Sequence, residues 1–127
     1  MPALARFGRR VIAATRKRGW DVSVLLVDDP TIRSLNRRWR RLDRATDVLS
    51  FPYGPGPDRV LGDVVISVPR AAEQARRFRV SLARELKRLL VHGILHLMGY
   101  DHKTAAQRRE MRAIEGRLLA GAGRRAR

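Results

Sequence analysis

The sequence predicts an α+β domain in which a small mixed β-sheet packs with about five helices. Segments with helical and strand-like patterns follow in the order helix, strand, helix, strand, strand, helices. One late segment is apolar enough to be a central, buried helix. The length of 127 residues suits one compact domain, and no repeat or linker divides the chain. Residues 1–127 are therefore predicted to form a single domain.

The first twenty residues predict an N-terminal helix (1–20). Its inward positions recur at helical spacing on one face, and they are Leu4, Phe7, Val11 and Thr15. The helix is expected to run from residue 3 to about 18, where Gly19 ends it. The β-branched-rich run 22–27 then predicts a strand.

Asp29 and Pro30 predict the start of a second helix, because a capping side chain is followed by a residue that needs no N–H partner. The expected inner face of this helix consists of Ile32, Leu35, Asn36 and Trp39. Residues 47–51 predict a short strand. The Pro- and Gly-rich segment 52–57 predicts an exposed loop, and 61–68 predicts a further strand.

Three helices are expected in the last part of the chain. Pro69 can begin the first of them, and Ser81 caps the next. That second helix is predicted to be the central one, because its apolar positions are Leu82, Leu86, Leu89, Leu90, Ile94 and Leu97. Thr104 caps a final helix, with Met111, Ile114 and Leu118 inward. Residues 121–127 are predicted to form a basic flexible tail.

Charge and cysteine content limit the possible functions. The chain has 28 Lys and Arg residues against 12 Asp and Glu, which gives a net charge of +16. A charge of this size attracts polyanions such as nucleic acid, although an arginine-rich codon bias explains it equally well. There is no cysteine, so disulfides and thiolate metal sites are excluded. No apolar run approaches the roughly 20 residues of a membrane span, so the expected location is cytoplasmic.

All three histidines lie in the segment His92-Gly-Ile-Leu-His-Leu-Met-Gly-Tyr-Asp-His102. His92 and His96 are four residues apart, so they project from one face of a helix. Gly99 can adopt a positive φ, which allows the chain to turn back and bring His102 to the same ion. Three protein ligands leave one position open, as in catalytic zinc sites. The spacing therefore favours one Zn²⁺ at the end of the central helix over three histidines that bind no metal.

The offsets of these histidines and of Gly99 match the metzincin protease pattern His-Glu-x-x-His-x-x-Gly-x-x-His. The protease has its general-base Glu directly after the first His, where this chain has Gly93. Glycine cannot accept a proton, so peptide hydrolysis is disfavoured. A metal hydrolase acting on a peptide or another substrate stays open as an alternative.

Three blocks of sequence occur in order along the chain. They are Leu35-Asn36 with Trp39-Arg40 and Thr46-Asp47-Val48-Leu49-Ser50-Phe51-Pro52, then Leu61-Gly62-Asp63-Val64-Val65-Ile66-Ser67, and then the histidine segment. In these blocks the chain resembles the YbeY family of bacterial endoribonucleases and ribosomal RNA maturation factors, from residue 22 to about 118. It departs from the family at Ala45, where Pro is common, and at Trp39, where Tyr is frequent.

The resemblance implies a zinc-dependent, single-strand-specific endoribonuclease. Its expected role is maturation of ribosomal RNA, especially the 16S rRNA 3′ end, and ribosome quality control. The implied partners are RNA and the small ribosomal subunit, with no membrane partner, and the sequence indicates no oligomeric state. The alternative is a non-catalytic, zinc-stabilised assembly factor of the small subunit.

The resemblance also implies an arginine near the metal, which maps onto Arg40 and would clamp the scissile phosphate. Asp101 is the second candidate catalytic residue, although it could instead orient a histidine N–H or cap the turn. The candidate substrate-binding residues are Thr46, Ser50 and Tyr100. A turn hydrogen bond, a strand hydroxyl and local packing explain these three equally well.

Overall fold

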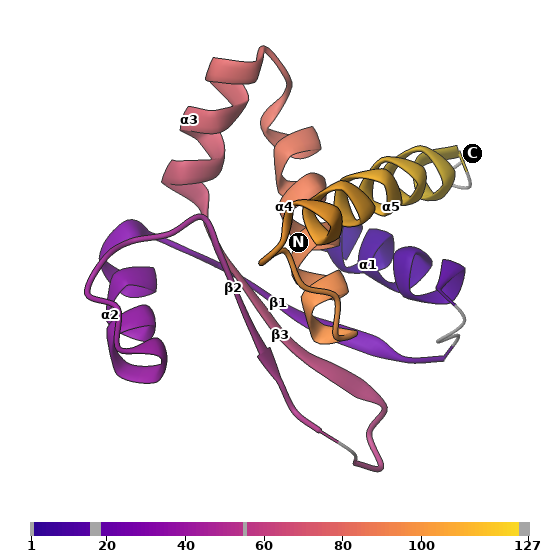
Figure 1. Cartoon of the computed structure of the whole chain (residues 1–127), viewed down its shortest axis with the longest axis horizontal. Helices are drawn as coiled ribbons and strands as arrows, with labels where there is room; N and C mark the ends of the chain where they lie inside the picture. Colours follow the sequence, from indigo (N-terminus) through magenta and orange to yellow (C-terminus); the bar gives the residue numbers. More distant parts are fainter. Residues whose placement is uncertain (1, 16–18, 55, 125–127) are drawn as a thin grey trace.

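The structure, a computed structural model, describes residues 2–15, 19–54 and 56–124. Within them the chain forms α1 (Pro2–Ala14), β1 (Asp21–Val27), α2 (Asp29–Arg40), β2 (Val48–Pro52), β3 (Val60–Ser67), α3 (Val68–Phe78), α4 (Leu82–Leu97) and α5 (Ala105–Arg124) (Figure 1). The predicted α+β class, with a small sheet and five helices, is confirmed for this part of the chain.

The strands form a mixed sheet in the order β1-β3-β2, where β1 runs parallel to β3 and β2 runs antiparallel to it. Neighbouring residues of a strand face opposite sides of a sheet. Val64 and Ile66 of β3 accordingly join the core with α1 and α4. Val65 instead packs with Ile32 of α2 and with Leu49. The helices therefore cover both faces, with α2 apart from α1, α4 and α5 (Figure 1).

The α4 helix is the buried centre of the molecule, as predicted. It packs against β2, β3, α1, α3 and α5, and its fully buried apolar side chains are Leu86, Leu89, Leu90, Val91, Ile94 and Leu95. Ser81 caps it by accepting the Arg84 N–H at 3.1 Å. Leu82, in the first turn, is 39% exposed, so the predicted inner stripe begins one turn later. The C-terminal end of α4 lies close to β2.

The expected start and inner face of α2 were each wrong at one position. Asp28, not Asp29, is the cap, because Asp28 has extended backbone angles and its carboxylate accepts the Thr31 N–H at 2.9 Å. The Asp29 carboxylate instead accepts the Ser67 hydroxyl at 2.5 Å. Trp39 is 62% exposed, because the small cluster around Ile32 receives the first turns of α2 and its last turn lies beyond that cluster.

The two ends of the chain also differ from expectation. The α1 helix ends at Ala14, and residues 16–18 of the predicted helix lie outside the described residues. The α5 helix continues to Arg124, where a flexible tail was predicted from residue 121, and 125–127 lie outside the described residues. Thr104 caps α5 as predicted, by accepting the Gln107 N–H at 3.1 Å. Among the described helices, none has the length and apolar character to cross a membrane.

Candidate metal centre

The three histidine rings converge at the C-terminal end of α4. His92 and His96 come from its last two turns, and His102 comes from the loop that follows. The three potential ligand nitrogens all lie within 4.8 Å of one another. The Nε2 atoms of His92 and His96 are 3.2 Å apart. Two ligands of a tetrahedral ion at about 2.0–2.1 Å are themselves about 3.4 Å apart. The observed separation therefore fits two ligands of one transition-metal ion.

The turn that returns His102 to the helix depends on Gly99. This residue has φ +97°, and a Cβ there would meet no atom within 4 Å, so its backbone conformation, not space, requires glycine. The Tyr100 N–H donates to the Leu95 carbonyl at 3.0 Å, which closes the helix end. The Asp101 carboxylate accepts the His102 N–H at 2.7 Å. Of the roles considered for Asp101, the structure supports capping of the turn.

The carboxylate that reaches a ligand histidine belongs to Glu115 of α5, which the sequence did not indicate. Its Oε2 atom lies 3.3 Å from Nδ1 of His92, and Glu115 is only 8% exposed. A carboxylate in this position keeps the proton on Nδ1 and leaves Nε2 free to bind a metal. The sequence feature that could have indicated Glu115 is its place on the inner face of α5. It lies four residues after the buried Met111 and three before Leu118.

The surroundings of His96 favour its metal-binding form. Burial lowers the pKa of His96, and the neighbouring His92 and His102 lower this pKa further. Asp101 opposes the shift by a smaller amount. A histidine must be neutral to bind a metal, so the lowered pKa keeps His96 available as a ligand to a lower pH than an exposed histidine.

The histidines lie in a polar cleft of about 650 Å³. Its walls are the C-terminal end of α4 with the following loop on one side, and β2 with the end of α2 on the other. The cleft brings together all eight site residues predicted from the sequence, namely Arg40, Thr46, Ser50, His92, His96, Tyr100, Asp101 and His102.

Arg40, the last residue of α2, is held at the wall of this cleft. Its Nη2 donates to the Ser50 carbonyl at 2.5 Å, and its guanidinium carbon lies 5.6 Å from the centre of the Phe51 ring. A guanidinium has five N–H donors, so this single bond orients the group and leaves donors for an anion. The position predicted from the family resemblance therefore has the geometry of an anion-binding side chain.

The predicted substrate-binding residues differ in their contacts. The Ser50 hydroxyl is buried and donates to the Gly93 carbonyl at 3.0 Å, so it joins β2 to α4. The Thr46 hydroxyl lies 3.4 Å from Oδ1 of Asp47. Tyr100 is 37% exposed at the rim of the cleft. Thr46 and Tyr100 are therefore positioned to meet a ligand, whereas the Ser50 hydroxyl has a structural partner.

Gly93 is where α4 comes closest to the sheet. A Cβ at this position would lie 2.6 Å from Cγ1 of Val64 and 3.2 Å from Oγ of Ser50. No side chain fits this space unless the helix or the strand moves. The place that the metzincin base occupies in sequence is therefore filled by β3, which explains why this chain has no carboxylate directly after His92.

We expect Glu115→Gln to weaken metal binding about 10–100-fold, because outer carboxylates of metal-bound histidines contribute about this much. The change removes the charge that orients His92 and keeps the shape of the side chain. Competition with a chromophoric chelator would measure the affinity. Glu110→Gln, on an exposed position of the same helix, is the matched control, and equal affinities for the two variants would contradict a role for Glu115 at the metal.

An α+β domain whose three histidine rings converge in a cleft that also holds an arginine has the features of a metal-dependent hydrolase. Residues 4–123 match the family model described as Endoribonuclease YbeY. The chain belongs to the YbeY family of endoribonucleases.

Individual relatives agree with this assignment. A protein named Endoribonuclease YbeY from Moorella thermoacetica is 50% identical over 114 residues, which cover 81% of this chain and 73% of the relative. The protein of the same name from Myxococcus xanthus is 45% identical over 126 residues, or 94% of this chain and 42% of the relative. The chain thus spans less than two thirds of some relatives. A solution structure of a Thermotoga maritima protein is similar, with a TM-score of 0.61 and 29% identity, covering 98% of this chain and 84% of that chain.

Proposed function

We propose that this chain is a zinc-dependent endoribonuclease that cleaves single-stranded RNA. Its proposed place is the cytoplasm, where it acts with the small ribosomal subunit in maturation of the 16S rRNA 3′ end and in ribosome quality control. The observation that carries the proposal is the meeting of three histidine rings and Arg40 in one cleft. The names of the relatives support RNA as the substrate.

The choice of zinc rests on the donor set. The three clustered side chains all offer imidazole nitrogens, and such ligands suit zinc and other transition metals better than Mg²⁺ or Ca²⁺, which prefer oxygen. Three ligands leave a position open, as in catalytic sites. When bound, the ion would supply Lewis acidity for attack of water on a phosphodiester.

The chain's own residues have separate tasks in this proposal. Glu115 orients His92, and Asp101 fixes the turn that presents His102. The free donors of Arg40 bind the non-bridging oxygens of the scissile phosphate and stabilise the charge that develops on them. The cleft has a volume of about 650 Å³, which is in the range of small-ligand sites. This size suits a short stretch of one extended RNA strand.

One observation favours the second candidate, a non-catalytic assembly factor in which zinc only stabilises the turn. Position 93 has no side chain that could act as a base, and the Asp101 carboxylate is engaged in capping. The two candidates differ in RNA cleavage by the purified protein. Cleavage that requires the histidines supports the enzyme.

We expect Arg40→Ala to lower the rate of RNA cleavage by about 100–1000-fold, the usual loss when one donor to a developing negative charge is removed. Arg40→Lys should recover only part of the rate, because an ammonium group cannot bind a phosphate bidentately. Single-turnover cleavage of a labelled RNA gives the rate. Arg38→Ala, at an exposed position two residues before Arg40, is the control. Full activity in a folded, metal-loaded Arg40→Ala protein would refute the role of Arg40.

A further inference from the structure

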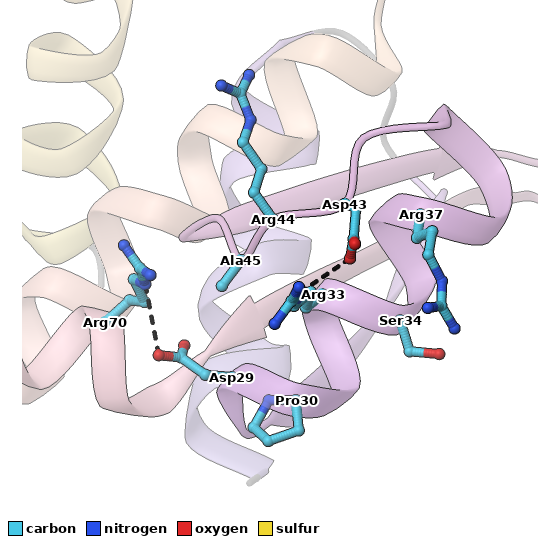
Figure 2. A pocket seen from close by; sticks show the side chains of 9 residues that line it. All are labelled: Asp29, Pro30, Arg33, Ser34, Arg37, Asp43, Arg44, Ala45 and Arg70. Atoms are coloured by element: carbon cyan, nitrogen blue, oxygen red, sulfur yellow. Dashed lines mark hydrogen bonds and ion pairs between the residues drawn. The ribbon is translucent and has the colours of Figure 1, made fainter.

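A second hollow, of about 730 Å³, lies beside α2 and is separate from the metal cleft (Figure 2). It is bounded by α2, by the loop that leads to β2 and by the first turn of α3. Four arginines and two aspartates line it, namely Arg33, Arg37, Arg44, Arg70, Asp29 and Asp43. We call it the arginine hollow. Its charged side chains give it an excess of two positive charges, so it favours an anionic ligand.

Two of these arginines are fixed by the two aspartates. Arg33 Nε lies 2.8 Å from Asp43 Oδ1, and Arg70 Nε lies 3.5 Å from Asp29 Oδ2. These pairs neutralise both carboxylates and hold the two guanidinium groups in place, as the dashed lines in Figure 2 show. Arginines oriented in advance lose less side-chain entropy when a ligand binds.

The other two arginines have no such partner. The guanidinium groups of Arg37 and Arg44 form neither a hydrogen bond nor an ion pair with the residues that the structure describes. Figure 2 shows Arg44 extending away from the two aspartate–arginine pairs and Arg37 lying beside Ser34, where Asp43 acts on it only through its charge. Their donors are therefore available to an external anion, and a planar guanidinium matches the oxygens of a phosphate.

The arginine hollow adjoins the metal cleft along the chain. Within the loop that leads to β2, residues 43–45 line the hollow and Thr46 lines the cleft. On α2, Arg33 and Arg37 line the hollow and Arg40 lines the cleft. These three arginines are spaced i, i+4, i+7, so they share one face of the helix over about 10 Å. The row leads from the hollow to the proposed scissile phosphate.

We propose that the arginine hollow binds backbone phosphates of the RNA strand on one side of the cleavage point, a proposal that rests on the proposed function. Arg37 and Arg44 carry the excess positive charge and bind these phosphates directly, while the paired Arg33 and Arg70 form the wall of the hollow. The arginine hollow adjoins the metal cleft, so one RNA strand can occupy both. This favours RNA over an acidic protein as the ligand. The hollow thus adds affinity for longer substrates and does not take part in the chemical step.

The test compares the double variant Arg37→Gln/Arg44→Gln with Arg6→Gln/Arg117→Gln. The control removes the same charge from exposed positions of α1 and α5. Steady-state cleavage is measured on single-stranded RNAs of about 4 and about 16 nucleotides, the range of sizes that such sites cover. For the longer RNA the first variant should raise KM about 10-fold with kcat unchanged. The short RNA should show no change, and neither should the control.

The salt dependence gives a second readout. Loss of two phosphate contacts should reduce the slope of log(kcat/KM) against log[salt] by about 1.4 for a single strand. Equal thermal unfolding of both double variants shows that the protein is folded, and the single variants Arg37→Gln and Arg44→Gln replace the pair if it unfolds.

Two results would overturn the proposal. KM for the longer RNA could stay unchanged, which would leave an acidic protein as the ligand of the hollow. KM could also rise equally in both double variants, which would indicate non-specific charge attraction. In each case the parent still cleaves RNA, so the proposed function stands. If the parent cleaves neither RNA, the proposed function itself has failed.

Discussion

Replacing His96 by alanine is expected to abolish RNA cleavage, with a fall in kcat of at least about 1000-fold. In the proposed site His96 lies between the other two histidines, since its ring centroid is 4.7 Å from those of both His92 and His102. Without it only two imidazole ligands remain, fewer than the three protein ligands of a catalytic zinc site, so the affinity for the ion should fall strongly. Lewis acid assistance contributes several kcal/mol to hydrolysis, and each 1.4 kcal/mol is about tenfold in rate.

The measurement is cleavage of a labelled single-stranded RNA by parent and variant at equal protein concentration, with zinc present. His92→Ala and His102→Ala should show losses of the same order, because the site acts as a unit. Thermal unfolding shows whether each variant is folded. Unchanged cleavage in folded His96→Ala protein would assign the activity to a contaminant or another site. An inert variant that still supported ribosome maturation would favour the assembly factor.

Gly93→Ala is expected to destabilise the fold by about 1–3 kcal/mol, the usual cost of overpacking a core. The new Cβ would lie 2.6 Å from Cγ1 of Val64 and 3.0 Å from its Cγ2, both on the central strand of the sheet. Either α4 or β3 has to move, and the Ser50–Gly93 hydrogen bond would be disturbed. Urea unfolding at constant pH gives the change in free energy.

A matched glycine in α5 provides the control for this prediction. A Cβ on Gly116 meets no atom within 4 Å, so Gly116→Ala should stabilise the protein by up to about 1 kcal/mol through helix propensity alone. Val64→Ala with Gly93→Ala should cost less than the sum of the two single changes, because Val64→Ala removes both clashing methyl groups. Equal stabilities of Gly93→Ala and Gly116→Ala would show that α4 does not depend on close contact with β3.

Local patterns bring the three histidines together, which is why the sequence predicts their cluster. The spacing of His92 and His96 follows from helix periodicity, and Gly99 identifies the turn toward His102. The prediction of Arg40 came from the family resemblance, because nothing in the local sequence distinguishes it from the other arginines of α2. Geometry then shows its bond to the Ser50 carbonyl.

Features that depend on packing between distant elements were not predictable in this way. Glu115 reaches His92 only because α5 crosses the end of α4, 23 residues later in the chain. Trp39 has the periodicity of a core residue, yet the cluster beneath α2 is too small to cover the last turn. The arginine hollow likewise requires the first turns of α2 and α3 to meet, as the Asp29–Arg70 ion pair shows, and the net charge alone does not indicate this.

The central claim is that three imidazole rings hold one transition-metal ion with an open position. Elemental analysis of the purified protein, after addition of zinc and removal of the excess, tests it most directly when the parent and the His96→Ala variant are compared. We predict about one zinc ion per chain for the parent and a value near zero for the variant. A parent that retains no transition metal, or a variant that retains as much as the parent, would contradict the account.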